Sequence, residues 1–193
     1  MHAVMLVLQD PQTARGFTLI ELMIVLVIAA VLLMIGTPML SEFMADQRVR
    51  TVSSDIMADI AFARAKALEN SRRVYLERTG ATWTGGWHIF VDINNDTVFN
   101  AGDEELKVFT GFPAGTTLSV CSNVADFANT VIFRPDGRIV RTTAANQTDG
   151  LYVIDTLGDA AVANDKIRGI LFGGLGRATV VKMNGLALPA GCV

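Results

Sequence analysis

An unbroken run of apolar residues near the amino end constrains the fold of this chain more than any other feature. Every residue from Leu22 to Ile35 is apolar, and the stretch extends to Phe17 and Leu40 with Glu21 as its main interruption. The chain is 51% hydrophobic but only 7% aromatic, so aliphatic residues are concentrated here. A helix rises about 1.5 Å per residue, and about 20 residues cross the ~30 Å core of a bilayer. The stretch is therefore long enough for a membrane-spanning helix.

Two ordinary kinds of segment share this apolar character. A secretory signal peptide has a small-residue cleavage site and a polar mature start after the run, and nothing of that kind follows Ile35. A single-pass anchor fits the hydropathy. It leaves Glu21 unexplained, because a carboxylate within an apolar run costs a few kcal/mol unless it has a partner or a function.

The residues around Glu21 carry a specific motif. Arg15 to Leu22 read RGFTLIEL and lead directly into the apolar run. This segment resembles the prepilin cleavage and methylation motif of type IV pilins and type II secretion pseudopilins. The resemblance implies that a prepilin peptidase cuts between Gly16 and Phe17 and that Phe17 is then N-methylated.

The chemistry of these positions fits that processing. Gly16 offers no side chain, so a peptidase can approach the scissile bond closely. The cut creates a positive amine on Phe17, and the resemblance implies that Glu21 pairs with this amine of a neighbouring subunit in the filament core. Such pairing explains a carboxylate in hydrocarbon, because two buried opposite charges neutralise one another.

Beyond the apolar run, the pattern predicts that the helix continues. Proline removes a backbone hydrogen bond and bends a helix, so we expect a kink at Pro38 and not an end. From about Ser41 to Asn70, apolar residues recur at helical spacing, which predicts an amphipathic helix packed on a globular head. Its apolar stripe comprises Val49, Val52, Ile56, Ile60, Ala63 and Ala67. Charged residues lie on its other faces, and they are Arg48, Arg50, Asp55, Asp59, Arg64 and Lys66. The bases among them are interpreted as a solvated face, with a binding surface as the alternative.

After Ser71 the pattern changes to short β-prone runs, most of them separated by Gly, Asn, Asp or Pro. The runs are residues 73–77, 87–92, 106–110, 117–120, 130–133, 138–141, 151–155, 167–172 and 178–183. Many short strands with polar turns predict an antiparallel β-sandwich, with the long helix over one face. The fold class expected is therefore α+β.

The head carries a second resemblance. Gly86 to Asp92 read GWHIFVD before an Asn/Asp-rich turn, and Gly176-Arg177 precedes the last predicted strand. This arrangement is similar to the minor-pilin group that contains FimT, FimU and pseudopilin H. It implies the type IV pilin fold and a minor pilin or pseudopilin that primes or caps assembly of a type IV pilus or a type II secretion pseudopilus.

The resemblance also implies an organisation and a set of partners. The four parts are a leader peptide (1–16), a transmembrane and filament-core helix (17–40), an amphipathic helix (41–70) and a periplasmic head (71–193). The chain would be held in the inner membrane before it enters a filament. Its partners would be the prepilin peptidase, other minor pilins or pseudopilins, the major pilin, the inner-membrane assembly platform and membrane lipid.

The expected periplasmic location of the head favours a disulfide between the two cysteines. Cys121 and Cys192 would face the periplasm, where disulfides persist. A bridge between them would pin the carboxyl end to the head and stabilise the fold by ~4 kcal/mol in the chain-entropy model. Two buried free thiols are the alternative.

The turn after the Gly86–Asp92 motif has the spacing of a calcium loop. Oxygen-bearing side chains fall at positions one, three, five, nine and twelve of the run, like those of an EF-hand. These residues are Asp92, Asn94, Asp96, Asn100 and Asp103. Thr97 stands where such loops have glycine, and Asp103 where they have glutamate. Because Asn and Asp also favour hairpin turns, a turn without metal stays open.

DNA uptake is the alternative function, because some FimT-like pilins bind DNA during natural transformation. A Gly-Arg-x-Arg element near the carboxyl end supplies phosphate contacts in those pilins, but residues 176–179 read Gly-Arg-Ala-Thr here. The candidate phosphate contacts are Arg168, Arg177 and Lys182, and a second basic group comprises Arg134, Arg138 and Arg141. The net charge of −3 gives no global attraction to nucleic acid, so ordinary exposed side chains are the simpler interpretation.

An enzyme is not expected. His88 lies on a predicted strand, outside any recognisable acid–base or nucleophile constellation. The sequence contains no phosphate-binding loop or metal triad and no CxxC pair, which makes a zinc site improbable. No cofactor other than calcium is suggested.

Overall fold

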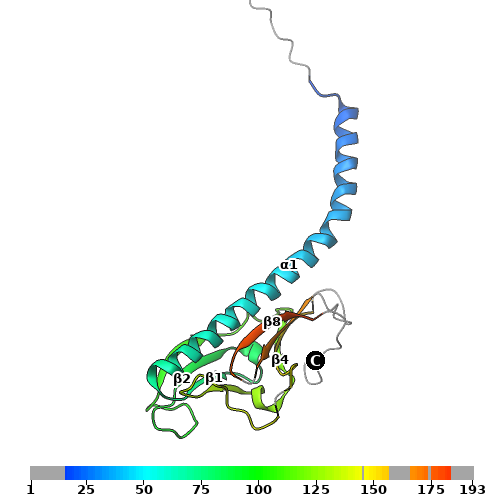
Figure 1. Ribbon diagram of the computed structural model, residues 1–193. Helices are drawn as coiled ribbons and strands as arrows, with labels where there is room; N and C mark the ends of the chain where they lie inside the picture. Colours follow the sequence, from blue (N-terminus) through cyan, green and yellow to red (C-terminus); the bar gives the residue numbers. More distant parts are fainter. Residues whose placement is uncertain (1–15, 145, 157–165, 174, 184–193) are drawn as a thin grey trace, which may run out of the picture. The chain divides into compact units, whose positions relative to one another are not determined.

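The computed structural model describes residues 16–144, 146–156, 166–173 and 175–183, without the side chains of residues 35 and 37–39. The chain divides into two compact units, Met1–Ser41 and Glu42–Val193, and one helix, α1 (Leu19–Asn70), runs through both. The described part of the first unit consists mainly of the first turns of this helix. The second unit is the head, and it includes the later turns of the helix (Figure 1). The helix does not end at Pro38, and the kink expected there stays a prediction.

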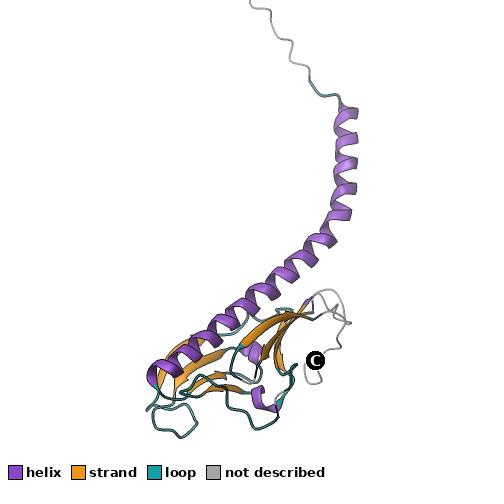
Figure 2. Cartoon of the chain, in the orientation of Figure 1, coloured by secondary structure: helices purple, strands orange, loops and turns teal. Residues whose placement is uncertain are grey.

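The head contains two antiparallel four-stranded sheets among its described residues (Figure 2). In spatial order, the first sheet consists of β3 (Glu104–Phe109), β2 (Trp87–Val91), β1 (Val74–Arg78) and β5 (Thr130–Phe133). The second consists of β4 (Leu118–Ser122), β6 (Gly150–Asp155), β7 (Ile167–Phe172) and β8 (Ala178–Lys182). Two short 3-10 helices, η1 (Trp83–Gly85) and η2 (Ala125–Phe127), lie in connections.

One hydrophobic core joins the helix to both sheets. Strand side chains alternate between faces, so Val74 and Leu76 of β1 join this core while Tyr75 points to the other face and stacks on Phe90. The second sheet contributes Val120 and Val153, among others. The expected α+β class is confirmed: the helix packs on antiparallel sheets.

The helical stripe is also confirmed. Every residue predicted to face the head is buried: Val49, Val52, Ile56, Ile60, Ala63 and Ala67. The neighbouring charged residues do not form the solvated face that we expected. Asp59 is buried and Arg48 contacts a buried carboxylate, while Arg64 Nε donates to the carbonyl of Gly137 at 3.0 Å. The interpretation of the bases as solvated was wrong for Arg48 and Arg64, because their partners lie on a strand and in a turn far along the chain.

Eight of the nine predicted strands are present, within two residues at each end. Residues 138–141 form no strand, and an isolated bridge from Phe133 to Ile139 is the pairing found there. The chain returns from β5 through a tight turn in which Gly137 N donates to Arg134 O at 2.8 Å. Gly137 has a φ of 74° and lies against the helix, where an added Cβ would meet Arg64 Nε at 3.1 Å. The helix therefore occupies the space beside this turn.

Candidate functional site

The expected processing site immediately precedes the helix. Gly16, Phe17 and Thr18 have no regular secondary structure, and α1 begins at Leu19. A Cβ added to Gly16 would meet nothing within 4 Å, and Phe17 is 84% exposed. Nothing in the described chain therefore covers the bond between Gly16 and Phe17. Cleavage and methylation there stay predictions.

Thr18 caps the first turn of α1. The backbone N–H of Glu21 donates to Thr18 Oγ1 at 3.2 Å, and the N–H of Leu22 donates to the Thr18 carbonyl at 3.2 Å. Thr-x-x-Glu is the spacing of a capping box, and a carboxylate in the first turn is favoured by the helix dipole. This capping role is not among the predictions made from the sequence, although the spacing of Thr18 and Glu21 is its signal.

Glu21 stands at the edge of an exposed apolar surface. Among the described residues it has no basic partner. The apolar side chains that follow it are more than half exposed on all sides of the helix, and they are Leu22, Met23, Ile24, Val25, Leu26, Val27, Ile28, Val31, Leu32, Leu33 and Met34. A helix that is hydrophobic all round belongs in apolar surroundings. Within the part of the chain that the structure describes, however, no helix meets the length and hydropathy needed to cross a bilayer.

Two ion pairs join the head portion of α1 to the second sheet. Arg48 Nη2 lies 2.9 Å from Asp155 Oδ2, and Asp155 is fully buried at the end of β6. Asp46 binds the guanidinium of Arg168 on β7 and also accepts from Arg50 Nε at 2.7 Å. Buried charges need such partners, because an unpaired one would be strongly destabilising.

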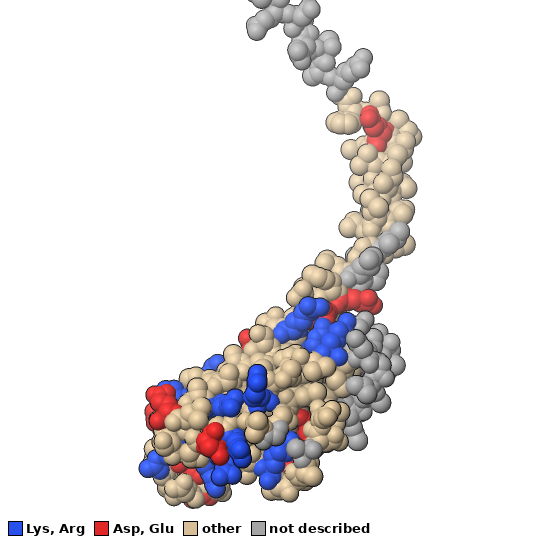
Figure 3. All heavy atoms as spheres, in the orientation of Figure 1, with Lys and Arg blue, Asp and Glu red and all other residues tan. Residues whose placement is uncertain are grey.

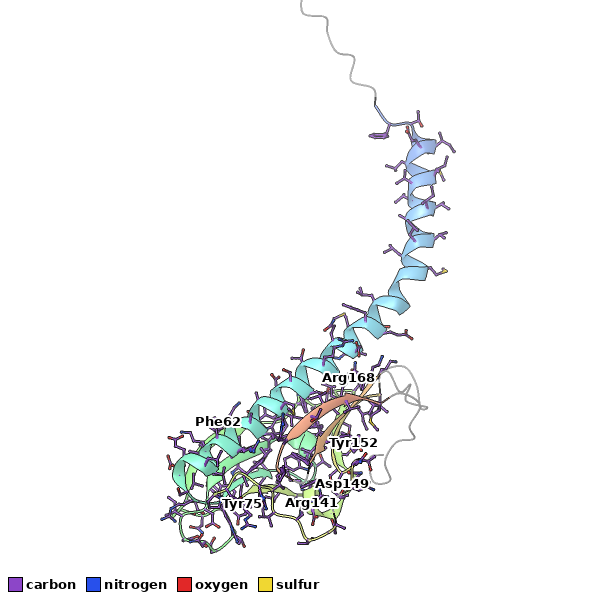
Figure 4. The ribbon with its side chains drawn as sticks, in the orientation of Figure 1. Phe62, Tyr75, Arg141, Asp149, Tyr152 and Arg168 are labelled. Atoms are coloured by element: carbon purple, nitrogen blue, oxygen red, sulfur yellow. The ribbon has the colours of Figure 1, made fainter. Side chains whose placement is uncertain are left out.

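Arg168 is therefore not an exposed phosphate contact. It is 5% exposed and paired with Asp46, which contradicts the interpretation of this residue as part of a DNA-binding surface. Figure 4 shows it at the end of the head far from Arg141. Lys182 lies opposite Arg168 in the pairing of β7 with β8, and both Lys182 and Arg177 are exposed. The three residues do not form one exposed group.

A third polar contact joins the helix to the first sheet. Trp87 Nε1 donates to Asp59 Oδ2 at 2.8 Å, and Lys107 Nζ binds Asp59 Oδ1. Asp59 is 3% exposed, whereas the side chain of Lys107 is 51% exposed. Trp87 also stacks on Phe109, with ring centroids 4.1 Å apart. One helical carboxylate thus binds both β2 and β3.

The loop from Asp92 to Asp103 is held by its own side chains. Asp103 accepts the backbone N–H groups of Ile93 and Asn100, each at 3.0 Å. Asp92 Oδ2 accepts the N–H of Thr97 at 3.2 Å. Asn and Asp oxygens that accept nearby backbone N–H groups are the usual turn-forming contacts. This arrangement fits the hairpin interpretation of the loop.

The structure gives one observation that favours calcium binding in this loop and two that do not. Asp92 is fully buried, and its Oδ1 has no hydrogen-bond partner in the described structure. Asp96 Oδ2, however, accepts from Asn94 Nδ2 at 2.9 Å, and Asn94 Oδ1 accepts the backbone N–H of Asp96 at 3.1 Å, so both oxygens already have donors. In the described residues no group of three or more His, Cys, Asp or Glu side chains is placed to hold a metal ion. Calcium binding stays a prediction.

The expected disulfide falls partly outside the described residues. Cys121 lies on β4, half-buried, and is not a free thiol. Cys192 lies outside the described residues, so the pairing of the two cysteines stays a prediction.

Comparison with protein families identifies two regions of the chain. The family model described as type II transport protein GspH matches residues 53–168. The model described as the prokaryotic N-terminal methylation motif matches residues 12–37. The first covers the last turns of α1, from residue 53 on, and most of the strands. The second covers the processing site and the start of the apolar helix.

One curated relative and two crystal structures are similar to this chain. The pilin-like protein PilA1 of Thermus thermophilus is 34% identical over 94 residues, which are 48% of this chain and 57% of the relative. The chain thus matches a little over half of that protein's length. Two crystal structures of the type IV minor pilin FimU of Pseudomonas aeruginosa give TM-scores of 0.54 and 0.53. They cover 76% and 75% of this chain and 96% and 99% of FimU, at 16% identity, which is a likeness of fold.

Proposed function

Because this chain belongs to the type II transport protein GspH family and is a type IV minor pilin or pseudopilin of the GspH/FimU type, we propose that it primes or caps assembly of a pilus or pseudopilus. Its work would be structural and not catalytic. The partners would be other minor pilins or pseudopilins, the major pilin and an inner-membrane assembly platform. A prepilin peptidase would act on it first.

One observation carries this proposal: the amino-terminal part of α1 is apolar on every side and carries Glu21 in its first turn. The head does not need this segment to form its core, since the head has its own hydrophobic core and forms a separate compact unit. Neighbouring helices of the same kind, or membrane lipid before assembly, would supply the apolar surroundings. As part of this proposal, the chain would be held in the inner membrane before assembly, with its head in the periplasm.

Cleavage of the leader would create the positive group that pairs with Glu21. A cut between Gly16 and Phe17 places a new ammonium group four residues before Glu21 in the sequence. This ammonium and the carboxylate of an adjacent subunit would neutralise one another in the filament core. Removal of one partner from a buried pair costs about 3–5 kcal/mol. Filament entry should therefore depend on Glu21 far more than membrane retention does.

The test compares Glu21→Ala with Glu42→Ala, which removes an exposed carboxylate from the same helix beyond the apolar run. We expect both variants in the membrane fraction. We expect Glu21→Ala in filaments at less than about a tenth of the unmodified level, and Glu42→Ala near that level. Normal filament entry of Glu21→Ala would refute the pairing.

The alternative to this assembly role is that of a minor pilin that binds DNA for uptake. Of the three residues suggested by the sequence, Arg177 and Lys182 are exposed and Arg168 is buried. Two separate cations give little affinity for a phosphate backbone. We therefore favour the assembly role over DNA uptake through these residues.

A further inference from the structure

Five arginines surround two adjoining hollows at the end of the head where α1 finishes. One hollow, of about 540 Å³, is lined by residues of the helix end and the turn after β5, including Arg72, Arg73 and Arg134. The other, also about 540 Å³, is lined by Arg73, Arg134, Arg138 and Arg141 with parts of the neighbouring backbone. Since Arg73 and Arg134 line both, the hollows adjoin, and we call the two together the arginine groove.

The fold fixes the position of these arginines. The helix ends at Asn70, and Ser71 turns the chain with a φ of 51°, which sends Arg72 and Arg73 directly into β1. Directly after the neighbouring strand β5, Arg134 N donates to Arg138 O at 2.8 Å and closes the turn between them. Because β1 and β5 pair with Val74 opposite Phe133, the start of one strand lies beside the end of the other.

The groove keeps most of its positive charge. Asp136 is the one acid of the turn, and its Oδ1 lies 3.9 Å from Arg134 Nε and accepts the N–H of Arg138 at 3.0 Å. Arg72 donates to the Ile93 carbonyl at 2.6 Å, which leaves its charge uncompensated. Arg72, Arg73, Arg134 and Arg138 are all exposed.

Arg141 forms the inner end of the groove. Its side chain is only 10% exposed; Nη2 binds Asp149 and Nε lies 3.9 Å from Asp126 Oδ2, so two acids compensate this arginine, although Nε and Nη1 have no hydrogen-bond partner among the described residues. Figure 4 shows Arg141 and Asp149 close together in the head. On the face drawn in Figure 3, basic side chains lie in separate groups with acidic ones between them. With a net charge of −3, attraction for an anion must be local, and the arginine groove is a local excess of cations.

We propose that the arginine groove binds the phosphate groups of a linear polyanion. A guanidinium group is planar and always charged, and its N–H groups match the oxygens of phosphate in pairs. Several guanidinium groups around two adjoining hollows fit a ligand whose phosphates repeat along a chain. A nucleic acid and inorganic polyphosphate share this chemistry. The proposal does not depend on the assembly role or on Arg168, Arg177 and Lys182.

The test uses the full-length chain in a neutral detergent with fluorescently labelled single-stranded oligonucleotide at 50–400 mM salt. The variant Arg73→Gln/Arg134→Gln/Arg138→Gln removes three exposed cations and leaves Arg141 with Asp149. We expect at least a tenfold loss of affinity at the lowest salt. The slope of log affinity against log salt should fall by roughly 2, because each single-strand phosphate contact contributes about 0.7. Arg177→Gln is the control, and we expect less than about a twofold change.

Two competitors distinguish the source of the anion. Polyphosphate that displaces the oligonucleotide from the same arginines shows that phosphate alone is recognised; failure to displace it assigns the groove to nucleic acid. Polyglutamate that binds in place of both phosphate ligands would overturn the proposal and make the groove a surface for an acidic protein. Absence of binding, or equal effects of the triple variant and Arg177→Gln, would also overturn it. Unchanged tryptophan fluorescence of the triple variant establishes that its head is folded.

Discussion

The contact of Asp59 with Trp87 and Lys107 can be tested quantitatively, because it is the polar link between α1 and the first sheet. Replacement of Lys107 by methionine removes the ammonium but leaves the Asp59 carboxylate buried with one hydrogen bond, from Trp87 Nε1. Loss of one partner of a fully buried pair costs about 3–5 kcal/mol. The Lys107 side chain is 51% exposed, so water offsets part of this cost. We expect Lys107→Met to lower the free energy of unfolding by about 2 kcal/mol.

A double-mutant cycle separates the ion pair from the packing of Lys107. Asp59→Asn keeps an oxygen for Trp87 but carries no charge. In that background Lys107→Met should cost less than about 0.5 kcal/mol, which gives a coupling energy of about 1.5 kcal/mol. Lys66→Met is the matched control, because Lys66 pairs with the exposed Glu69 at 2.9 Å on the same helix. Exposed pairs of this kind contribute at most about 0.5 kcal/mol.

The assay is urea unfolding of the full-length chain in a neutral detergent, followed by tryptophan fluorescence. The chain has two tryptophans, Trp83 and Trp87, and both are buried in the head, so the signal reports this unit. For a unit of this size, 2 kcal/mol corresponds to a fall of about 4–8 °C in Tm. Equal effects of Lys107→Met and Lys66→Met, or a coupling energy below about 0.5 kcal/mol, would refute the reasoning.

Two further predictions concern loops of the head. Burial raises the pKa of Asp126, but hydrogen bonds from Thr142 and Thr143 outweigh burial and hold it at about 2. The ionised form is favoured in the folded state, so its stabilisation of up to about 2 kcal/mol is complete above pH 4 and is lost as the pH falls through 2. Urea unfolding between pH 5 and 2 should therefore show a smaller loss of stability in Asp126→Asn; equal losses would contradict this. Millimolar calcium should raise the Tm if the loop binds it, and Asp103→Asn should abolish the rise; an unchanged Tm ends the calcium hypothesis.

The sequence predicts those parts of the fold that depend on local pattern. The apolar stripe from Val49 to Ala67 repeats at the helical period, and every member is buried. The strands follow alternation between turn residues, and eight of nine lie where expected. Residues 138–141 have the same local pattern but form no strand, because the helix and the turn at Gly137 determine the path of the chain there.

The polar contacts between helix and sheets could not be predicted in this way. Asp59 resembles any charged residue on an amphipathic helix, and its partners Trp87 and Lys107 are 28 and 48 positions away. Arg168 looked like an exposed cation because its partner, Asp46, is 122 positions away. A single sequence gives periodicity within an element but carries no sign of which charges meet across elements. These long-range pairings are the reason that the predictions of a solvated helix face and of Arg168 as an exposed DNA contact were wrong.

The relation between Thr18 and Glu21 gives the cleavage position a structural meaning beyond recognition by a peptidase. Thr18 accepts the N–H of Glu21 and so satisfies one of the free N–H groups at the start of α1. A cut before Phe17 would leave Thr18 as the second residue of the mature chain, so the helix would keep its cap. A cut two residues later would remove Thr18 and expose the first turn just where the chain must enter apolar surroundings. The cap thus limits how close to the helix the leader can be removed without cost to the segment that follows.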